Sequence, residues 1–417
     1  MKILHTTKSY HPSGGGMYEV TKRLSEELVK LGHDVTVATK KPSESLNENI
    51  NGVKVVTFNI SGNLALGLGG EIKKYQDFLI NSDFDIITDF AAQHTLTDAM
   101  LPILDKIKAK KVFVPTGFTA FYMKEYKDYF ENMRTWFKKY DMNVFLSNDY
   151  RDINFARENN VKNITIIPNG ASKEEFLQKT DIDIRKKLSI PKDDFLTLHI
   201  GSHTGMKGHN ESMKIFSKAN IKNATFLLVG NDKNTGCKKE CEKKATKLNN
   251  SKIFKKLNKK IIITTLDRQE TVAAYKEADL FLFPSNIECS PIVLFEAMAS
   301  KTPFLTTDVG NAQEIIKWSG GGILLPTKKS DYLNSNDFLK YNIKKVLRLF
   351  GIKYVHNDYK FSKAKILKSA KILESLYLDD IKLEKLSKSG YEAWLKNFTW
   401  EKISKDYEKM YLNLLNK

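Results

Sequence analysis

The start of the chain constrains the fold most, because it alternates strand, glycine-rich loop, helix and strand within 40 residues. Residues 2–7 (KILHTT) are interpreted as a short buried strand, and residues 8–16 (KSYHPSGGG) supply the loop. Residues 17–32 have apolar positions at helical spacing and end in glycine, before a second expected strand at 34–40 (DVTVATK). This order predicts one βαβ unit of a parallel sheet.

The same alternation continues and then restarts. Residues 195–219 again read as strand, glycine-containing loop and helix, and a Pro-Asn-Gly turn within 168–176 marks the expected hinge. Two successive doubly wound sheets place a ligand crevice at the carboxyl ends of both sets of strands. The remaining strands of the first sheet are expected at 52–60, 84–90, 111–116, 142–147 and 163–170.

The formal charge of +18 comes mainly from lysine, since only seven of the 67 basic residues are arginine. Proteins that recognise nucleic-acid sequence use arginine side chains that contact base edges, and clustered basic surfaces. Here lysine is spread along the whole chain. Nucleic-acid binding is therefore a hypothesis that the charge supports but no recognisable nucleic-acid-binding motif does. The charge also fits anionic lipid or phosphorylated substrates.

Three cysteines, Cys237, Cys241 and Cys289, are too few for a disulfide framework. Cys237 and Cys241 are one helical turn apart, and no Cys/His grouping has zinc spacing, so they are interpreted as free thiols on a helix. No apolar run reaches the ~20 residues of a membrane-spanning helix. These features predict a cytoplasmic protein without a metal cofactor, with a peripheral position on the inner membrane face as an alternative.

Residues 285–303 (SNIECSPIVLFEAMASKTP) contain two glutamates, Glu288 and Glu296, around a Ser-Pro step. Ser290 is predicted to be the N-cap and Pro291 the first residue of a helix. The amides of the first turn form a natural anion site. Because carboxylates repel phosphate, the two glutamates are interpreted as partners of hydroxyl groups attached to a bound phosphate. A sugar nucleotide carries such hydroxyl groups on both sides of its diphosphate.

This stretch resembles the retaining family-4 glycosyltransferases of the GT-B fold. Glu288 and Glu296 keep the family's Glu-x7-Glu spacing, an E-A-M-A run begins at Glu296, and Asp308, Gly310 and Glu314 match a following D-x-G-G-x-x-E stretch. The likeness extends over residues 1–325 and 363–417. Its other motifs are SGGGMYEVTKRLSEELVKLGHDVTV, IPNGASKEEF, IGSHTGMKGH, ADLFLFPSNIE and NFTWEKISKDYEKMY.

The resemblance implies a role for each matched residue. Glu296 would accept hydrogen bonds from the ribose hydroxyls, and Glu288 would lie by the donor sugar near the reaction centre. Lys207 would pair with the departing diphosphate, which makes Lys207 and Glu288 the catalytic candidates. Further donor contacts are implied for Gly15, Gly16, Ser290, Pro291, Ile292 and Val293.

The chain departs from the family pattern at two positions. Ser202 stands where an arginine is common, and Thr116 where a histidine is common. His94, His203 and His209 are candidates to replace them. The candidate donor contacts in these regions are Ser202, His203 and Leu266 from the variable loop 264–270, and the candidate acceptor or sugar contacts are His94 and Thr116.

The resemblance implies two Rossmann-like domains facing a cleft, with a C-terminal helix that crosses back to the first. We expect an acceptor domain at 1–172, a donor domain at 173–390 and returning helices at 391–417. An insertion is expected at 328–362, with a basic amphipathic helix that either packs on the protein or meets anionic lipid. The aromatic stripe at 122–140 is expected to be core, with an acceptor site or lipid contact as alternatives.

The sequence therefore predicts a retaining glycosyltransferase. It would move sugar from a nucleotide-diphosphate donor to a glycan, lipid-linked or protein acceptor. The alternatives are a degenerate, non-catalytic sugar-nucleotide binder and another GT-B enzyme, such as a sugar-nucleotide epimerase or phosphorylase.

Overall fold

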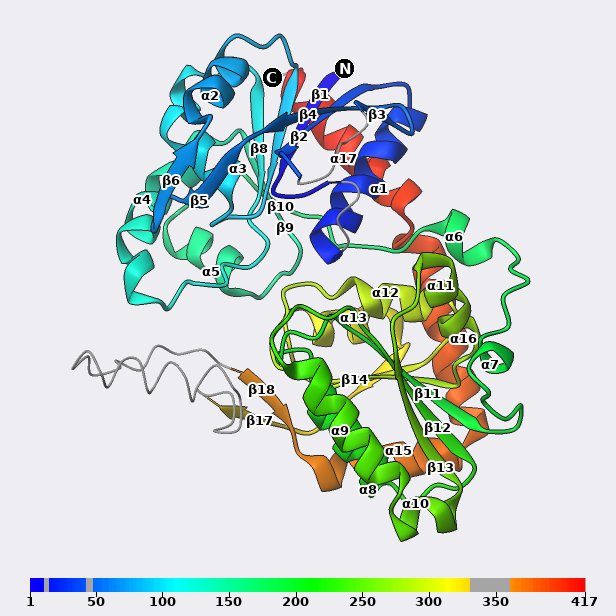
Figure 1. The fold of residues 1–417 in the computed structure, drawn as a ribbon. Helices are drawn as coiled ribbons and strands as arrows, with labels where there is room; N and C mark the ends of the chain where they lie inside the picture. Colours follow the sequence, from blue (N-terminus) through cyan, green and yellow to red (C-terminus); the bar gives the residue numbers. More distant parts are fainter. Residues whose placement is uncertain (11–14, 43–47, 331–360, 417) are drawn as a thin grey trace, which may run out of the picture. The chain divides into compact units, whose positions relative to one another are not determined.

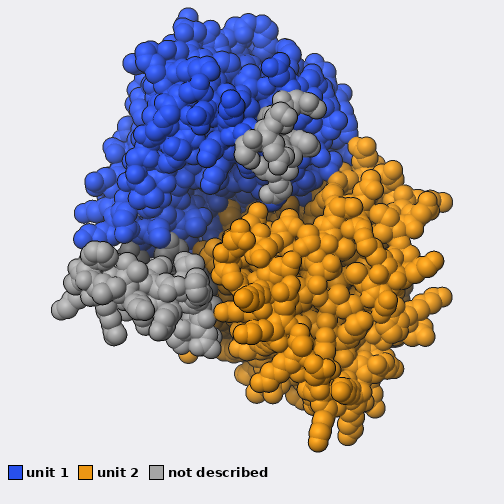
Figure 2. Space-filling view, in the orientation of Figure 1, with its two compact units in different colours: residues 1–170, 398–417 blue, residues 171–397 orange. Residues whose placement is uncertain are grey.

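The computed structural model describes residues 1–10, 15–42, 48–330 and 361–416. The chain forms two compact units (Figures 1 and 2). Unit 1 contains residues 1–170 and 398–417, and unit 2 contains residues 171–397. The divisions thus fall after residues 170 and 397, compared with 172 and 390 in the sequence-based scheme. The expected amphipathic helix within 328–362 lies outside the described residues.

Unit 1 is built on an eight-stranded sheet with the order β10-β9-β8-β7-β1-β2-β4-β3, parallel except for the β3–β4 pair. The central strands are buried, including their polar residues, because helices cover parallel sheets on both faces. The strands are β1 (Lys2–Thr7), β2 (Asp34–Lys40), β3 (Asn49–Ile50), β4 (Val53–Phe58), β7 (Ile86–Phe90), β8 (Lys110–Val114), β9 (Met142–Phe145) and β10 (Ile164–Ile166).

The helices of unit 1 are α1 (Gly16–Lys30), α2 (Ile72–Ile80), α3 (Thr95–Met100), α4 (Lys127–Lys139), α5 (Arg151–Glu158) and α17 (Trp400–Leu415). Two 3-10 turns (Leu101–Lys106 and Lys124–Tyr126) and a hairpin of β5 (Ile60–Asn63) and β6 (Gly67–Gly70) complete it. The aromatic stripe on α4 is core, as expected, because Tyr129, Phe130, Met133 and Phe137 are buried. The alternative prediction that these four side chains contact lipid is therefore wrong.

The C-terminal helix α17 belongs to unit 1, where it packs on α1 (Figure 1). The hydroxyls of Tyr411 and Thr88 are 2.6 Å apart, and His33 Nε2 is 2.9 Å from a carboxylate oxygen of Glu408. Thr399 caps the helix by accepting a hydrogen bond from the amide of Lys402. Residues 398–417 thus complete the first unit, although the whole of unit 2 separates them from it in sequence.

Unit 2 has a six-stranded parallel sheet with the order β13-β12-β11-β14-β15-β16. Its strands are β11 (Phe195–Ile200), β12 (Ala224–Val229), β13 (Lys259–Thr264), β14 (Leu280–Phe283), β15 (Phe304–Thr306) and β16 (Gly322–Leu324), with a separate antiparallel pair of β17 (Thr327–Ser330) and β18 (Phe361–Ala364). Successive strands run outward from β11 in one direction and then from β14 in the other. The sheet therefore reverses its order between β11 and β14.

The helices of unit 2 are α6 (Lys173–Leu177), α7 (Ile184–Lys187), α8 (His209–Lys218), α9 (Cys237–Asn249), α10 (Lys252–Leu257), α11 (Arg268–Glu277), α12 (Ile292–Ala299), α13 (Ala312–Ser319), α15 (Ile366–Tyr377) and α16 (Asp380–Asn397). The buried Trp394 of α16 donates from its indole nitrogen to the carbonyl of Ala171, 3.2 Å away. This bond ties the end of α16 to the start of the unit. The described residues contain no helix long and apolar enough to cross a membrane.

Candidate donor-binding site

The predicted site residues of unit 2 gather where the sheet reverses its order. The loop at 201–208 follows β11, and the loop at 284–291 follows β14, the neighbouring strand. In doubly wound sheets, ligands bind at the carboxyl ends of the strands at this switch point. The topology therefore brings together two loops that lie far apart in sequence.

Lys207 and Glu288 meet across these loops. Lys207 Nζ lies 2.8 and 2.9 Å from the two carboxylate oxygens of Glu288. Ser285 donates its hydroxyl to the same carboxylate at 2.8 Å. The Lys207 side chain remains 31% exposed whereas that of Glu288 is only 10% exposed, so the ammonium group is the more accessible partner. Sequence reasoning missed Ser285, although it lies within the motif ADLFLFPSNIE.

The backbones of the two loops are also joined. The amide of Asn286 donates to the carbonyl of Met206 at 2.9 Å. Gly208 has a φ of 74°, and a Cβ atom there would lie 2.0 Å from the carbonyl oxygen of Pro284. Glycine is required at this position because the conformation is left-handed and the neighbouring backbone leaves no space for a side chain.

Replacing Gly208 with alanine is expected to displace the Lys207 loop and to destabilise unit 2 by several kcal/mol, since strain and a backbone clash act together. Chemical denaturation followed by circular dichroism measures this loss. Gly205 is a matched control, because it has a similar φ of 78° but a Cβ added there would meet no atom within 4 Å. An equal loss in Gly205→Ala and Gly208→Ala would show that the close approach to Pro284 has no effect.

Helix α12 begins one residue later than the sequence predicts. Pro291 is the N-cap and Ile292 the first helical residue, so the prediction of Ser290 as N-cap is wrong. The hydroxyl of Ser290 instead accepts a hydrogen bond from Asn311 Nδ2 at 3.1 Å. The amides of Ile292 and Val293 still belong to the first turn, where no intrahelical acceptor exists. Glu296 lies more than one turn inside the helix, as predicted.

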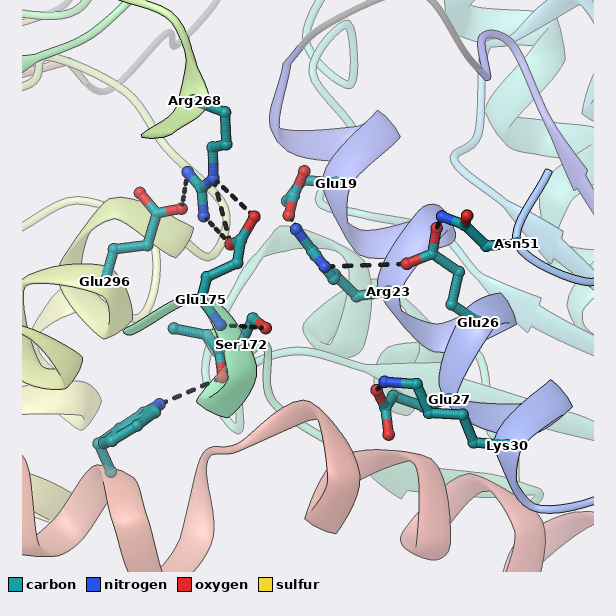
Figure 3. Close-up of polar contacts among 12 residues, drawn as sticks. Glu19, Arg23, Glu26, Glu27, Lys30, Asn51, Ser172, Glu175, Arg268 and Glu296 are labelled. Carbon is teal, nitrogen blue, oxygen red and sulfur yellow. Dashed lines mark hydrogen bonds and ion pairs between the residues drawn. The ribbon is translucent and has the colours of Figure 1, made fainter. Parts of the chain in front are cut away.

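Glu296 is held by an arginine that the sequence did not indicate as a site residue. Arg268, the first residue of α11, donates from Nη1 to Glu296 Oε1 at 2.6 Å. The same guanidinium donates from Nη2 to Glu175 Oε2 at 2.7 Å, so it lies between two carboxylates (Figure 3). Its aromatic neighbour is Phe176, whose ring centroid is 5.7 Å from the guanidinium carbon. Arg268 therefore fixes the orientation of the Glu296 side chain.

The structure changes the interpretation of two histidines in the Lys207 loop. His203 is fully buried, and its ring stacks on that of His209 with centroids 4.4 Å apart. His209 is 2% exposed, and its Nε2 lies 3.0 Å from the carbonyl oxygen of Gly201. Burial places both rings beneath the loop, so neither can replace an exposed basic donor ligand. Ser202 and Leu266 are partly exposed after β11 and β13, and their donor contacts stay predictions.

The predicted residues of unit 1 follow the carboxyl ends of three adjacent strands. Gly15 and Gly16 come after β1, His94 after β7 and Thr116 after β8. Gly15 has a φ of 132° and Gly16 begins α1. Four non-glycine residues of the β7 and β8 loops have left-handed backbones: Ala91, Gln93, Thr116 and Phe118. Such strained residues cluster at functional sites, which supports this edge as a candidate acceptor or sugar contact.

Charged side chains brace the first turns of α1. Arg23 Nε lies 2.6 Å from a carboxylate oxygen of Glu19, and Glu26 accepts a hydrogen bond from Asn51 at 2.7 Å (Figure 3). The Arg23, Glu19 and Glu26 side chains are 11%, 14% and 10% exposed, respectively. This network fixes the helix that follows Gly15 and Gly16.

Two buried carboxyl groups lie behind the His94 loop. Asp98 accepts hydrogen bonds from the Tyr129 hydroxyl at 2.8 Å and the Leu64 amide at 2.9 Å. Asp89 accepts from the Tyr140 hydroxyl at 2.9 Å and from two threonine hydroxyls. Burial raises the pKa of Asp98 to about 7 and that of Asp89 to about 6, although these hydrogen bonds oppose the shift.

The raised pKa of Asp98 predicts a pH effect on unit 1. In the folded state the Asp98 carboxyl keeps a proton that it releases near pH 4 in the unfolded chain. Its contribution to the free energy of unfolding is therefore complete below pH 4 and is lost as the pH rises to about 7. We expect a carboxyl ¹³C resonance that titrates near pH 7 and disappears in Asp98→Asn but not in the exposed control Asp128→Asn. Its persistence in Asp98→Asn would contradict the assignment.

Comparison with known proteins finds glycosyltransferase family models that match both halves of the chain. Residues 14–175 match the family model "Glycosyltransferase Family 4", and residues 180–336 match "Glycosyl transferases group 1". An uncharacterized glycosyltransferase of Methanocaldococcus jannaschii is 25% identical over 384 residues, which cover 86% of this chain and 93% of that protein.

Solved structures confirm the fold. The sucrose-phosphate synthase of Thermosynechococcus elongatus has a TM-score of 0.71 at 17% identity, covering 100% of this chain and 99% of that one. Anabaena HepE, solved with UDP and glucose, has a TM-score of 0.70 at 13% identity, covering 99% and 100%. The GT-B prediction is confirmed, and nothing in these comparisons supports the alternatives of a non-catalytic binder or an epimerase. The chain belongs to the family-4, group 1 glycosyltransferases.

Proposed function

We propose that this enzyme transfers a sugar, with retention of configuration, from a nucleotide-diphosphate donor bound on unit 2 to a glycan, lipid-linked or protein acceptor. The observation that carries the proposal is the juxtaposition of Lys207 and Glu288 at the sheet reversal, next to the helix that bears Glu296. HepE, whose fold this chain shares, was solved with UDP and glucose, which supports a nucleotide-sugar donor.

The chemistry requires stabilisation of the leaving diphosphate. Glycosyl transfer builds negative charge there, and a donor aimed at developing charge is worth about 3–4 kcal/mol. Lys207 supplies an ammonium group, which it shares with the Glu288 carboxylate, and the first turn of α12 adds amide donors and a partial positive charge. We infer that these groups neutralise the diphosphate without a divalent cation, so added Mg²⁺ should not stimulate turnover.

The two glutamates suit the hydroxylated ends of the donor. Arg268 donates to Oε1 of Glu296, and a carboxylate has about four acceptor positions, so acceptor capacity remains for ribose hydroxyls. Glu288, 10% exposed and oriented by Lys207 and Ser285, would contact the donor sugar. Retention of configuration follows from the resemblance to retaining enzymes, and ¹H NMR of the product anomer tests it.

A thermal-shift screen against nucleotide sugars tests the donor class. A ligand at ~100 times its dissociation constant adds ~2.7 kcal/mol of stability, which is readily detected. The best donor should then be hydrolysed slowly by wild-type enzyme and not by Glu288→Gln. If no nucleotide sugar raises the unfolding temperature, the proposal is contradicted. If one does but is neither hydrolysed nor transferred, the protein is a nucleotide-sugar binder and not a transferase.

We further propose a peripheral position on an anionic membrane for a lipid-linked acceptor, on the basis of the formal charge of +18. Sedimentation with anionic vesicles at low salt is the test. Because salt screens such contacts, binding should fall at high salt. Failure to sediment with anionic vesicles would remove the membrane from the proposal without affecting the donor site.

A further inference from the structure

A cluster of sulfur and nitrogen ligands lies beneath the Lys207 loop and has no part in the proposed transfer. One ring nitrogen of His203 and the sulfur atoms of Cys237 and Cys241 all lie within 4.8 Å of one another. His203 and Cys241 are buried, and Cys237 is partly buried. Such a group of soft ligands in one place is unusual for an unspecialised core.

The three residues are held by rigid elements. Cys237 is the first residue of α9 and Cys241 follows one turn later, so both thiols project from one side of the helix. The His203 amide donates to the carbonyl of Asn231 at 2.9 Å, and Thr235 donates its hydroxyl to the His203 carbonyl at 2.7 Å. The segment before α9 is thereby fixed to the histidine.

Among the described residues, the neighbouring polar partner of the His203 ring is the Cys237 thiol. The ring is fully buried, and within the described residues neither ring nitrogen makes a hydrogen bond of good geometry. Burying ring nitrogens without a well-formed hydrogen bond destabilises a fold, so such groups in native proteins require an explanation. A bound ion at the adjacent thiols would supply the missing interaction.

His209 lies beside the cluster and contacts one of its thiols. Its Nε2 lies 3.0 Å from the carbonyl of Gly201, and its Nδ1 lies 3.8 Å from the sulfur of Cys237. If Nε2 carries the proton and donates it to that carbonyl, Nδ1 presents a lone pair toward the thiols. Nδ1 can therefore orient the Cys237 sulfur, as groups around a metal site orient its ligands.

We propose that Cys237, Cys241 and His203 bind one soft divalent metal ion, of which Zn²⁺ is the natural example, with His209 beside the site as a group that orients Cys237. Zinc–sulfur bonds of about 2.3 Å and zinc–nitrogen bonds of about 2.1 Å place tetrahedral ligand atoms roughly 3.4–3.8 Å apart. The ligand atoms of His203, Cys237 and Cys241, which lie within 4.8 Å of one another, need to approach by about 1 Å to reach this geometry. No zinc spacing is visible in the sequence, because His203 precedes both cysteines by a long interval and lies in another loop.

The site would be structural and not catalytic. Its histidine shares with Lys207 the loop between β11 and α8. The ion would therefore join this loop to the start of α9, and it would fix the position of Lys207. This last consequence rests on the proposed function, but metal binding itself does not.

The test uses the full-length, reduced protein without a histidine tag. We expect one equivalent of zinc by elemental analysis, and on Co²⁺ addition a thiolate-to-cobalt charge-transfer band with tetrahedral visible bands. Cys237→Ser and Cys241→Ser should lose the charge-transfer intensity and bind the metal at least about tenfold more weakly. Cys289→Ser, at the third cysteine, which is not part of the cluster, should bind metal like wild type. Circular dichroism of each variant confirms that it folds.

The outcomes separate the possibilities. Substoichiometric metal with no cobalt–thiolate band in folded wild-type protein would overturn the proposal. So would a Cys237–Cys241 disulfide that persists under mild reduction, seen as a mass two hydrogens lower. His209→Ala should weaken binding by about 10–100-fold if its imidazole orients the Cys237 sulfur, and unchanged affinity would remove it from the site. None of these results depends on glycosyl transfer.

Discussion

Replacement of Lys207 with alanine is expected to lower kcat by about 10²–10³-fold, because the enzyme would lose its charged donor to the departing diphosphate. The effect should fall mainly on kcat, since the negative charge grows in the transition state. Steady-state kinetics with a saturating nucleotide-sugar donor measures it. Lys207 is also the ion-pair partner of Glu288. In the variant, the Glu288 carboxylate keeps the hydrogen bond from the Ser285 hydroxyl.

Lys218 provides the matched control. It lies on α8, which begins two residues after Lys207, and its side chain is exposed at the far end of that helix. Lys218→Ala removes the same charge from the same region and should retain wild-type kcat. A kcat in Lys207→Ala within a few-fold of the Lys218→Ala value would contradict the role of Lys207 in leaving-group departure.

Replacement of Glu296 with alanine is expected to weaken binding of a nucleoside diphosphate by about 10²-fold or more. A hydrogen bond to a charged group contributes about 1.5–3 kcal/mol, and the proposed ribose contact involves two hydroxyls. The fold should survive, because Arg268 keeps its ion pair with Glu175 at 2.7 Å. Isothermal titration calorimetry measures the dissociation constant.

Glu392→Ala is the control for this change, since it removes an exposed carboxylate from α16 in the same unit. Glu296→Gln should give an intermediate affinity, because the amide keeps one acceptor oxygen in a side chain of the same size. Nucleotide affinity in Glu296→Ala equal to that in Glu392→Ala would exclude Glu296 from the ribose contact.

The alternation of strand-like runs, glycine loops and helical spacing was sufficient to predict both sheets, because parallel strands buried on two faces are rich in apolar residues. The same loops place Lys207 and Glu288 at neighbouring strand ends, so their meeting follows from topology. Motif spacing likewise located Glu296 within α12. These features depend on local sequence or on strand order, which the chain displays directly.

Contacts between distant segments could not be predicted in this way. Arg268 contacts Glu175, 93 residues earlier, and no periodicity connects them. His203 meets Cys237 and Cys241 only because the loop after β11 lies against the start of α9. The error at Ser290 has a similar cause, since its hydroxyl bonds to Asn311 in another loop, while Pro291 takes the N-cap position.

The most direct measurement compares the dissociation constants of a nucleoside diphosphate and the corresponding monophosphate, for wild type and Lys207→Ala. If the loops after β11 and β14 form a diphosphate site, wild type prefers the diphosphate and Lys207→Ala loses most of that preference. Glu296→Ala should weaken both ligands and keep the ratio. An undiminished preference for the diphosphate in Lys207→Ala would contradict the assignment of this site.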